Sequence, residues 1–341
     1  MNRPYPSFVT APIEGTPGRV RFAFTSCVGG QGYHATAGYA DMASRTNFDL
    51  LFMLGDNHYA NSAEPAKQRL YYAEQRRQPG WRELTAGRAT YAIWDDHDFG
   101  PNNSDGTLAG KDLSLRTFKE HWANPGYGEP DNAGTYYKFT RSNVDFFLLD
   151  VRYYRTPNRA TNAPGRTMLG RAQVQWLKRE LLASRAPVKV IASGSEFQTD
   201  GTADSWANFK AERDEILQHI ANHDITGVLV VSGDRHFVAG YQAGGKVIEI
   251  TSGPLGSGNS NARAVPEMFL NFSPTKSKFY CVYDIDTEPT PPRVILEVYR
   301  VAEGLAHRRE FKWDEVLGQT KIPLLDLGTT NAPATQRAQG R

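Results

Sequence analysis

A short apolar run that stops at a glycine and an aspartate constrains this chain more than any other stretch. Residues 48–54 read Phe-Asp-Leu-Leu-Phe-Met-Leu, and Gly55-Asp56 follows directly. A nearly continuous apolar run of this length is typical of a strand that is buried on both faces. In open α/β sheets, ligands gather outside the carboxyl ends of such strands. The run therefore predicts a buried strand that presents Asp56 at a functional site.

The chain around this run predicts alternating strands and helices. Residues 19–26 become increasingly apolar, as in a strand, and residues 36–45 carry the spacing of a helix. With the run at 48–54 they form a βαβ unit, which favours two parallel strands with a right-handed crossover. Further helices are expected over 63–78, 112–123, 169–184 and 209–223. Further strands are expected over 90–94, 136–141, 144–150, 188–192, 227–233, 247–251, 278–285, 293–300 and 308–313.

Length and charge limit the classes of function. A chain of 341 residues can bury a large core, and a net charge of +2 gives no reason to expect a nucleic-acid or acidic-membrane partner. No stretch approaches the roughly 18 apolar residues of a membrane span. The first 20 residues hold no apolar signal core and no twin-arginine pair, so either a cytosolic protein or one with a removed export signal fits. Cys27 and Cys281 allow one disulfide, but their spacing does not establish it.

Four of the predicted strands end in residues that can bind metal ions. These residues are Cys27; Asp56 and Tyr59; Asp96, His97 and Asp98 with the amides Asn102 and Asn103; and Asp234 and His236. If the strands lie side by side, all four ends meet at one rim. Thiolate, phenolate and imidazole favour a transition metal, whereas carboxylate and amide oxygens favour Ca²⁺, Mg²⁺ or Mn²⁺. The pattern predicts a site for more than one metal ion.

Each of these residues also has an ordinary structural explanation. Cys27 fits a buried core thiol, and Tyr59 fits an aromatic cap on the sheet edge. Residues 95–98 fit a solvated turn, because aspartate is favoured there. Asp234 fits a helix N-cap and His236 a hydrogen-bonded core histidine. This reading needs a separate coincidence at each of four strand ends, so the metal site is the better supported interpretation.

The same residues resemble the alkaline phosphatase D (PhoD-like) family of calcineurin-like metallophosphatases. The matching stretches are Thr25-Ser26-Cys27, Gly55-Asp56-x-x-Tyr59, Trp94-Asp-Asp-His-Asp98 with Asn102, Leu149-Asp150-x-Arg152, Leu169-Gly170-x-x-Gln173-x-x-Trp176-Leu177 and Ser232-Gly-Asp-Arg-His236. Their order and spacing both fit the family, from about residue 19 to about residue 300. The Asp-x-His that opens the motifs of the wider group is absent here. Ser26-Cys27 stands in its place, which favours this branch of the group.

The resemblance implies an α/β fold, a four-layer α/β/β/α sandwich of two mixed sheets. It implies a single PhoD-like metallophosphatase domain over residues 19–328, after an extension at 1–18 and before a disordered tail at 329–341. Members of the family are usually exported to the periplasm or the medium, although no signal peptide is visible in this sequence. We expect a monomer that acts on a small phosphate mono- or diester, without a stable nucleic-acid partner or a membrane span.

The resemblance also implies a centre that holds Fe³⁺ and one or two Ca²⁺ ions. On the iron side the implied ligands are Cys27, Tyr59 and His236. The implied shared or adjacent ligands are Asp56 and Asp234. The same ligands leave Zn²⁺ or Mn²⁺ open as alternative ions.

On the calcium side, the resemblance implies Asn102 as a ligand, although the neighbouring Asn103 leaves this assignment uncertain by one residue. Asp96 takes the place of the ligand asparagine in the Gly-Asn-His motif of the wider group. His97 takes the place of the histidine in that motif. His58 matches no motif position, and it fits either a residue that supports the ligands or one that is merely exposed.

Together with the metal-ligand pattern, the resemblance implies a metal-dependent phosphoric ester hydrolase, an alkaline phosphatase or phosphodiesterase that uses a metal-bound hydroxide as its nucleophile. His97 and Asp98 are the predicted catalytic residues, with His97 helping the leaving oxygen take a proton. Arg235 and Arg152 are predicted to bind phosphate oxygens, because a guanidinium group matches phosphate; the alternative for each is a structural ion pair. Two other functions stay open: a di-zinc or di-manganese phosphodiesterase or nucleotidase, and a metal-stabilised binding domain without turnover.

Overall fold

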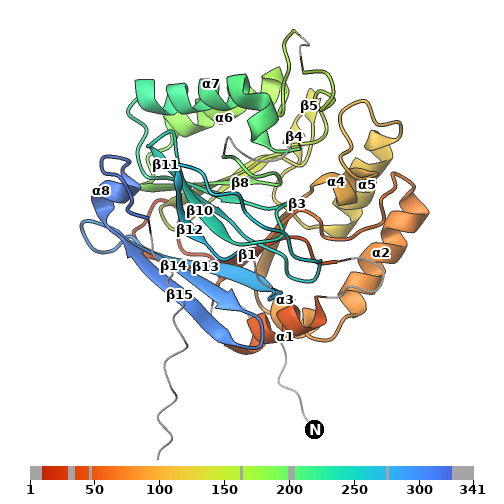
Figure 1. Ribbon diagram of the computed structural model, residues 1–341, viewed down its shortest axis with the longest axis horizontal. Helices are drawn as coiled ribbons and strands as arrows, with labels where there is room; N and C mark the ends of the chain where they lie inside the picture. The colour runs from red at the N-terminus through yellow and green to blue at the C-terminus, as the bar shows by residue number, and fades with distance from the viewer. Residues whose placement is uncertain are drawn as a thin grey trace, which may run out of the picture.

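Two large mixed sheets pack face to face, and helices cover the outer face of each (Figure 1). This computed structural model describes residues 10–29, 35–45, 48–161, 164–198, 204–273 and 276–324. The predicted tail at 329–341 and half of the extension at 1–18 lie outside these residues. So do most of residues 28–32, which the sequence predicts as a flexible loop. The predicted domain limits of 19 and 328 stay a prediction.

The first sheet has six strands in the order β15-β14-β13-β1-β2-β3. They are β1 (Arg19–Thr25), β2 (Leu50–Leu54), β3 (Ala89–Ile93), β13 (Phe279–Asp286), β14 (Arg293–Arg300) and β15 (Gly304–Phe311). β1, β2 and β3 run parallel, whereas β13, β14 and β15 form an antiparallel extension beside β1. The carboxyl ends of β1, β2 and β3 therefore lie next to one another at one edge.

The second sheet has seven strands in the order β12-β10-β11-β9-β8-β7-β6. They are β6 (Tyr137–Arg141), β7 (Val144–Leu148), β8 (Val188–Ser193), β9 (Val228–Ser232), β10 (Ala239–Ala243), β11 (Val247–Thr251) and β12 (Met268–Asn271). β7, β8, β9 and β11 are parallel. A separate two-stranded pair consists of β4 (Gly128–Glu129) and β5 (Asn132–Ala133).

Different helices cover the two sheets. The first sheet packs against α1 (Thr36–Arg45), α2 (Pro65–Arg77), α3 (Trp81–Thr85) and α5 (Lys111–His121). The second packs against α6 (Arg171–Ala183) and α7 (Lys210–Asn222), which lie on the opposite side of the molecule from α1 and α3 (Figure 1). The remaining helical turns are α4 (Asp96–Phe99), a 3₁₀ turn (Trp206–Phe209) and α8 (Trp313–Val316).

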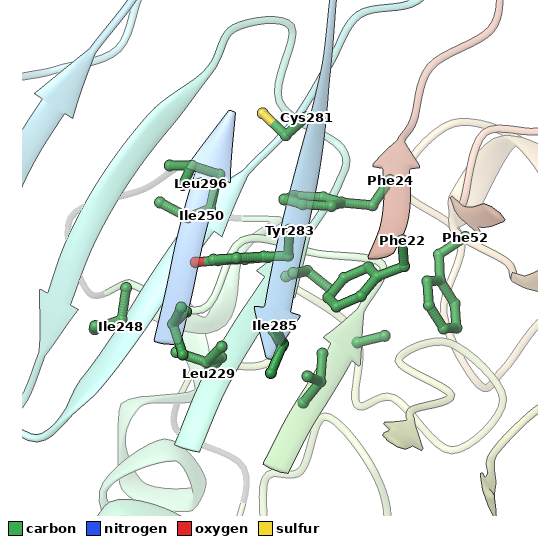
Figure 2. Packing of buried hydrophobic residues seen from close by; sticks show 14 of the residues in the cluster. Phe22, Phe24, Phe52, Leu229, Ile248, Ile250, Cys281, Tyr283, Ile285 and Leu296 are labelled. Atoms are coloured by element: carbon green, nitrogen blue, oxygen red, sulfur yellow. The ribbon is translucent and has the colours of Figure 1, made fainter. Parts of the chain in front are cut away.

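The core between the sheets explains why the strands read as apolar runs. Successive side chains of a strand point to opposite faces, so β1 places Phe22 and Phe24 between the sheets and Ala23 against the helices. The ring of Phe22 meets Phe52 at 5.3 Å and Phe146 at 5.4 Å, both edge-on, which joins the two sheets. Figure 2 shows Phe22 and Phe52 in this core, together with aliphatic residues of the opposite sheet such as Leu229. Both faces of the central strands are buried, so apolar residues predominate on both faces.

The four layers confirm the predicted fold class, and the parallel β1 and β2 around α1 confirm the βαβ unit. Most predicted elements lie within two residues of the observed ones. Among the strands of the two large sheets, the sequence missed β10 and β12. It also placed the last strand too late: β15 begins at Gly304, and Trp313 already belongs to α8. Cys27 and Cys281 are both free, so they form no disulfide with each other. In the described part of the chain, no helix combines the length and apolar character needed to cross a membrane.

Candidate metal centre

The four strand ends converge, but from two sheets. β1, β2 and β3 lie side by side as expected, whereas β9 belongs to the second sheet and meets them across the sandwich. The approach is close: a Cβ on Gly233 would lie 2.4 Å from the carbonyl oxygen of Leu54 and 2.9 Å from the Cβ of Ser26. Only glycine allows the end of β9 to sit against the ends of β1 and β2. The four strand ends therefore meet at one rim, as predicted, although the four strands do not all lie side by side in one sheet.

The chain turns in the same way at three of these ends. Cys27, Asp56 and Asp234 have φ values of 57°, 52° and 64°, in the left-handed region. This conformation is uncommon for residues other than glycine and costs of the order of 1–2 kcal/mol each. Neighbouring ends are tied together, since the N–H of Cys27 donates to Gly55 at 3.3 Å and that of Val28 to Asp56 at 3.1 Å. Strain retained at three strand ends is typical of a functional site.

Seven side chains form three overlapping groups, and within each group the ligand atoms lie within 4.8 Å of one another. The groups are Cys27, Asp56 and His236; Asp56, Asp96 and His97; and Asp95, Asp96 and Asp234. Asp56 is shared by the first two groups and Asp96 by the last two. The structure therefore brings together six of the residues predicted from the sequence, with Asp95 added.

One end of this row has the donors that suit a transition metal. The hydroxyl of Tyr59 donates to Asp56 at 2.9 Å and lies 3.5 Å from Nε2 of His236, beside the thiol of Cys27. Burial raises the pKa of both Cys27 and Tyr59 well above the usual values, and the carboxylate of Asp56 adds to both shifts. Burial, followed by the repulsion of His97, lowers the pKa of His236 to about 4. A bound cation would reverse the effect on the thiol and the phenol, because it favours their ionised forms.

The other end is crowded with buried carboxylates. Asp56, Asp95, Asp96 and Asp98 are each at most 2% exposed, and Oδ1 of Asp56 and Oδ2 of Asp95 have no hydrogen-bond partner among the described residues. Burial and then the charge of Asp96 raise the pKa of Asp56 well above its usual value. Buried like charges at this spacing cannot all be ionised without counter-charges. The residues therefore fit bound cations, which would let these carboxylates ionise together.

The two predicted catalytic residues have different surroundings. His97 is partly exposed, and its ring stacks on Tyr59 with centroids 4.0 Å apart. Asp98 is buried, and its two oxygens accept the backbone N–H groups of Asn57 at 3.0 Å and Asp95 at 3.1 Å. Burial raises the pKa of Asp98 to about 8. The contacts of Asp98 join the loop after β2 to the start of α4, and its catalytic role stays a prediction.

Both predicted phosphate-binding arginines contact carboxylates. Arg152 is fully buried, with Nε 2.5 Å from Asp95 and Nη2 2.6 Å from Asp204, which is the ion pair that the sequence left as the alternative. Arg235 has a partly exposed side chain, with Nε 3.5 Å from the buried Glu196. Asp95, Asp204 and Glu196 were missed from the sequence. Glu196 had a signal, since it follows Gly194 just beyond the end of a buried strand, whereas Asp204 had none.

The structure also places the two candidate asparagines and His58. Asn102 and Asn103 are both exposed, and the backbone N–H of Asn103 donates to Asp96 at 2.7 Å. Which amide contributes a ligand therefore stays a prediction. His58 is fully buried, with Nδ1 accepting from the N–H of Ala60 at 3.2 Å and its ring edge-on to Tyr72 at 4.2 Å. These contacts describe a packed core histidine.

Two further buried carboxylates, Glu249 on β11 and Glu196 after β8, give a pH-dependent prediction. Burial, and then the nearby Glu196, raise the pKa of Glu249 to about 8. A raised folded-state pKa means that stability is lost as pH rises from about 4.5 to about 8. We expect Glu249→Gln to have little effect on unfolding free energy at pH 4 and to be stabilising relative to wild type at pH 9. Urea unfolding at both pH values measures this, and an equal effect at pH 4 and pH 9 would contradict it.

Comparisons with known proteins bear on the family and the fold of this chain. The chain is 29% identical to alkaline phosphatase D of Bacillus subtilis (strain 168) over 279 aligned residues. The alignment covers 66% of this chain and 47% of that protein, so the chain spans about half the length of this relative. Its fold is similar to the structure of PhoD, with a TM-score of 0.67 at 21% identity over 89% of this chain and 73% of the other. It is also similar to a purple acid phosphatase from yellow lupin seeds (Lupinus luteus), with a TM-score of 0.62 at 12% identity over 90% and 56%. Residues 22–280 match the PhoD-like phosphatase family, and the chain therefore belongs to that family.

Proposed function

We propose that this chain is a metal-dependent phosphoric ester hydrolase, an alkaline phosphatase or phosphodiesterase. The observation that carries the proposal is the row of three ligand groups linked by Asp56 and Asp96. A structural metal site is usually closed by its own ligands, whereas carboxylates shared between neighbouring groups suit two or more ions side by side. Membership of the PhoD-like phosphatase family supports the same activity.

The donor types support a mixed metal centre. Cys27, Tyr59 and His236 offer sulfur, phenol and imidazole, which suit Fe³⁺, while Asp95, Asp96 and Asp234 offer only oxygen, which suits one or two Ca²⁺ ions. Zn²⁺ or Mn²⁺ on the same residues is the alternative. When bound, such ions generate a nucleophile from water near neutral pH and neutralise charge on the phosphoryl oxygens.

The other side chains of the rim supply binding and proton transfer. His97 is partly exposed beside Asp96, where it can give a proton to the leaving oxygen. Arg235 lies between Asp234 and His236 in the chain, and its Nε faces Glu196. Its partly exposed guanidinium is of the type that binds phosphate oxygens. We therefore retain Arg235 as the phosphate-binding arginine and assign Arg152 to holding Asp95 in place.

Hydrolysis of 4-nitrophenyl phosphate and bis(4-nitrophenyl) phosphate, with and without a chelator and alongside elemental analysis, tests the proposal. We expect turnover of at least one ester, its loss on chelation and its return when the metals identified by elemental analysis are added back. Bound metal without turnover of either ester would indicate a binding domain. Undiminished turnover after complete removal of metal would contradict metal dependence.

The iron assignment predicts a coloured protein. A phenolate bound to Fe³⁺ absorbs visible light, so we expect a visible band in the metal-loaded protein that Tyr59→Phe removes. The control is Tyr71→Phe, because Tyr71 lies on α2 outside the three ligand groups. A colourless protein that contains no iron and hydrolyses esters at the full rate would refute the assignment.

A further inference from the structure

Asn61, a residue that no motif includes, binds His97. It lies in the loop after β2, five residues beyond Asp56, with a left-handed φ of 51°. Its Nδ2 donates to the carbonyl oxygen of Tyr59 at 3.3 Å, and its Oδ1 contacts Nδ1 of His97. The first bond determines the second, because an amide whose nitrogen faces the carbonyl of Tyr59 must turn its oxygen toward His97.

This contact occupies one of the two ring nitrogens of His97. An amide oxygen can only accept, so Nδ1 of His97 carries the proton and donates it to Asn61. The ring of His97 also stacks on Tyr59, with an angle of 28° between the ring planes. Tyr59 thus restricts the tilt of the ring, and Asn61 restricts its rotation within that plane. With Nδ1 engaged by Asn61, Nε2 is the ring nitrogen that stays available to the substrate.

We propose that Asn61 is a positioning residue that holds Nε2 of His97 toward the leaving oxygen of the ester. This proposal rests on the proposed hydrolase function. In the step it serves, the bond between phosphorus and the leaving oxygen breaks, its electron pair stays on that oxygen, and the oxygen takes the proton from Nε2. The water that adds to phosphorus releases a proton, which returns His97 to its starting state.

The backbone at Asn61 suggests well-matched variants. Left-handed φ values favour glycine, asparagine and aspartate. Asn61→Gly therefore keeps the turn and removes the amide, and Asn61→Asp keeps both the turn and an acceptor for Nδ1–H. Because Asn61 is exposed, its hydrogen bond contributes little to folding, and both variants are expected to fold.

The test compares a good and a poor leaving group. We expect Asn61→Gly to lower kcat for an alkyl phosphate by about 10-fold, part of the 10²- to 10⁴-fold that proton transfer contributes. Hydrolysis of 4-nitrophenyl phosphate should change by less than about 2-fold, because nitrophenolate leaves without a proton. KM and metal content should stay as in wild type, and Asn61→Asp should recover most of the loss. Equal slowing of both esters, or loss of metal, would overturn the proposal.

A double-mutant cycle shows whether Asn61 acts through His97. We expect Asn61→Gly to have no further effect on the alkyl phosphate in a His97→Asn background, since the group that it positions is gone. A 10-fold effect that persists without His97 would overturn the positioning role. Failure of the wild-type protein to hydrolyse any ester is a different result, and it would overturn the proposed function itself.

Discussion

Asp56→Asn is expected to lose bound metal and activity together while the far-UV circular dichroism stays native-like. Asp56 belongs to two of the three ligand groups, so its loss weakens both ends of the row. Mutations of residues that only support metal ligands commonly cost 10- to 100-fold. Removal of a shared ligand should therefore lower kcat/KM by more than about 100-fold, with a matching fall in metal content by elemental analysis.

In the metal-free protein, the same substitution should increase stability. Without cations, burial and the neighbouring Asp96 oppose ionisation of Asp56, as its raised pKa indicates. A neutral amide removes this repulsion, so the metal-free variant should unfold at a higher temperature than metal-free wild type, while added metal should stabilise it less. Asp49→Asn, at an exposed carboxylate just before the same strand, is the matched control and should change neither property. Full activity in Asp56→Asn would contradict the metal centre.

Arg152→Met is expected to have the largest effect on stability. Arg152 and its partner Asp95 are both fully buried, and a second carboxylate, Asp204, lies 2.6 Å from the same guanidinium. Removing one partner of a buried ion pair commonly costs about 3–5 kcal/mol, because the remaining charges are left uncompensated. We expect a loss of this size in the free energy of unfolding, measured by urea denaturation.

Arg69→Met is the matched control for that loss. Arg69 also contacts a carboxylate through two nitrogens, at 2.7 and 2.8 Å from Glu120, but both side chains are exposed. An exposed pair contributes about 1 kcal/mol or less. The comparison also separates the two roles considered for Arg152. A variant with unchanged stability and a raised KM would restore Arg152 as a phosphate-binding residue.

The sequence predicted the central strands well because both of their faces are buried. Residues such as Phe22 and Ala23 on β1 have no polar alternative on either side, so burial is visible in composition alone. β10 lacks this signal: it reads Ala-Gly-Tyr-Gln-Ala, although all five residues are buried. Its partners on both sides, β11 and β12, hold it in the sheet, and a long-range pairing of this kind leaves little trace in local sequence.

By itself, the sequence determined the chemistry of the candidate site, because ligand types follow from residue identity and strand ends follow from where apolar runs stop. Only the tertiary structure decided how the ends meet. β9 reaches Asp56 from the other sheet, and Gly233 makes that approach sterically feasible. Tertiary structure also placed Arg152 against Asp95 and Asn61 against His97. Such contacts depend on distances between residues far apart in the chain, which no local pattern specifies.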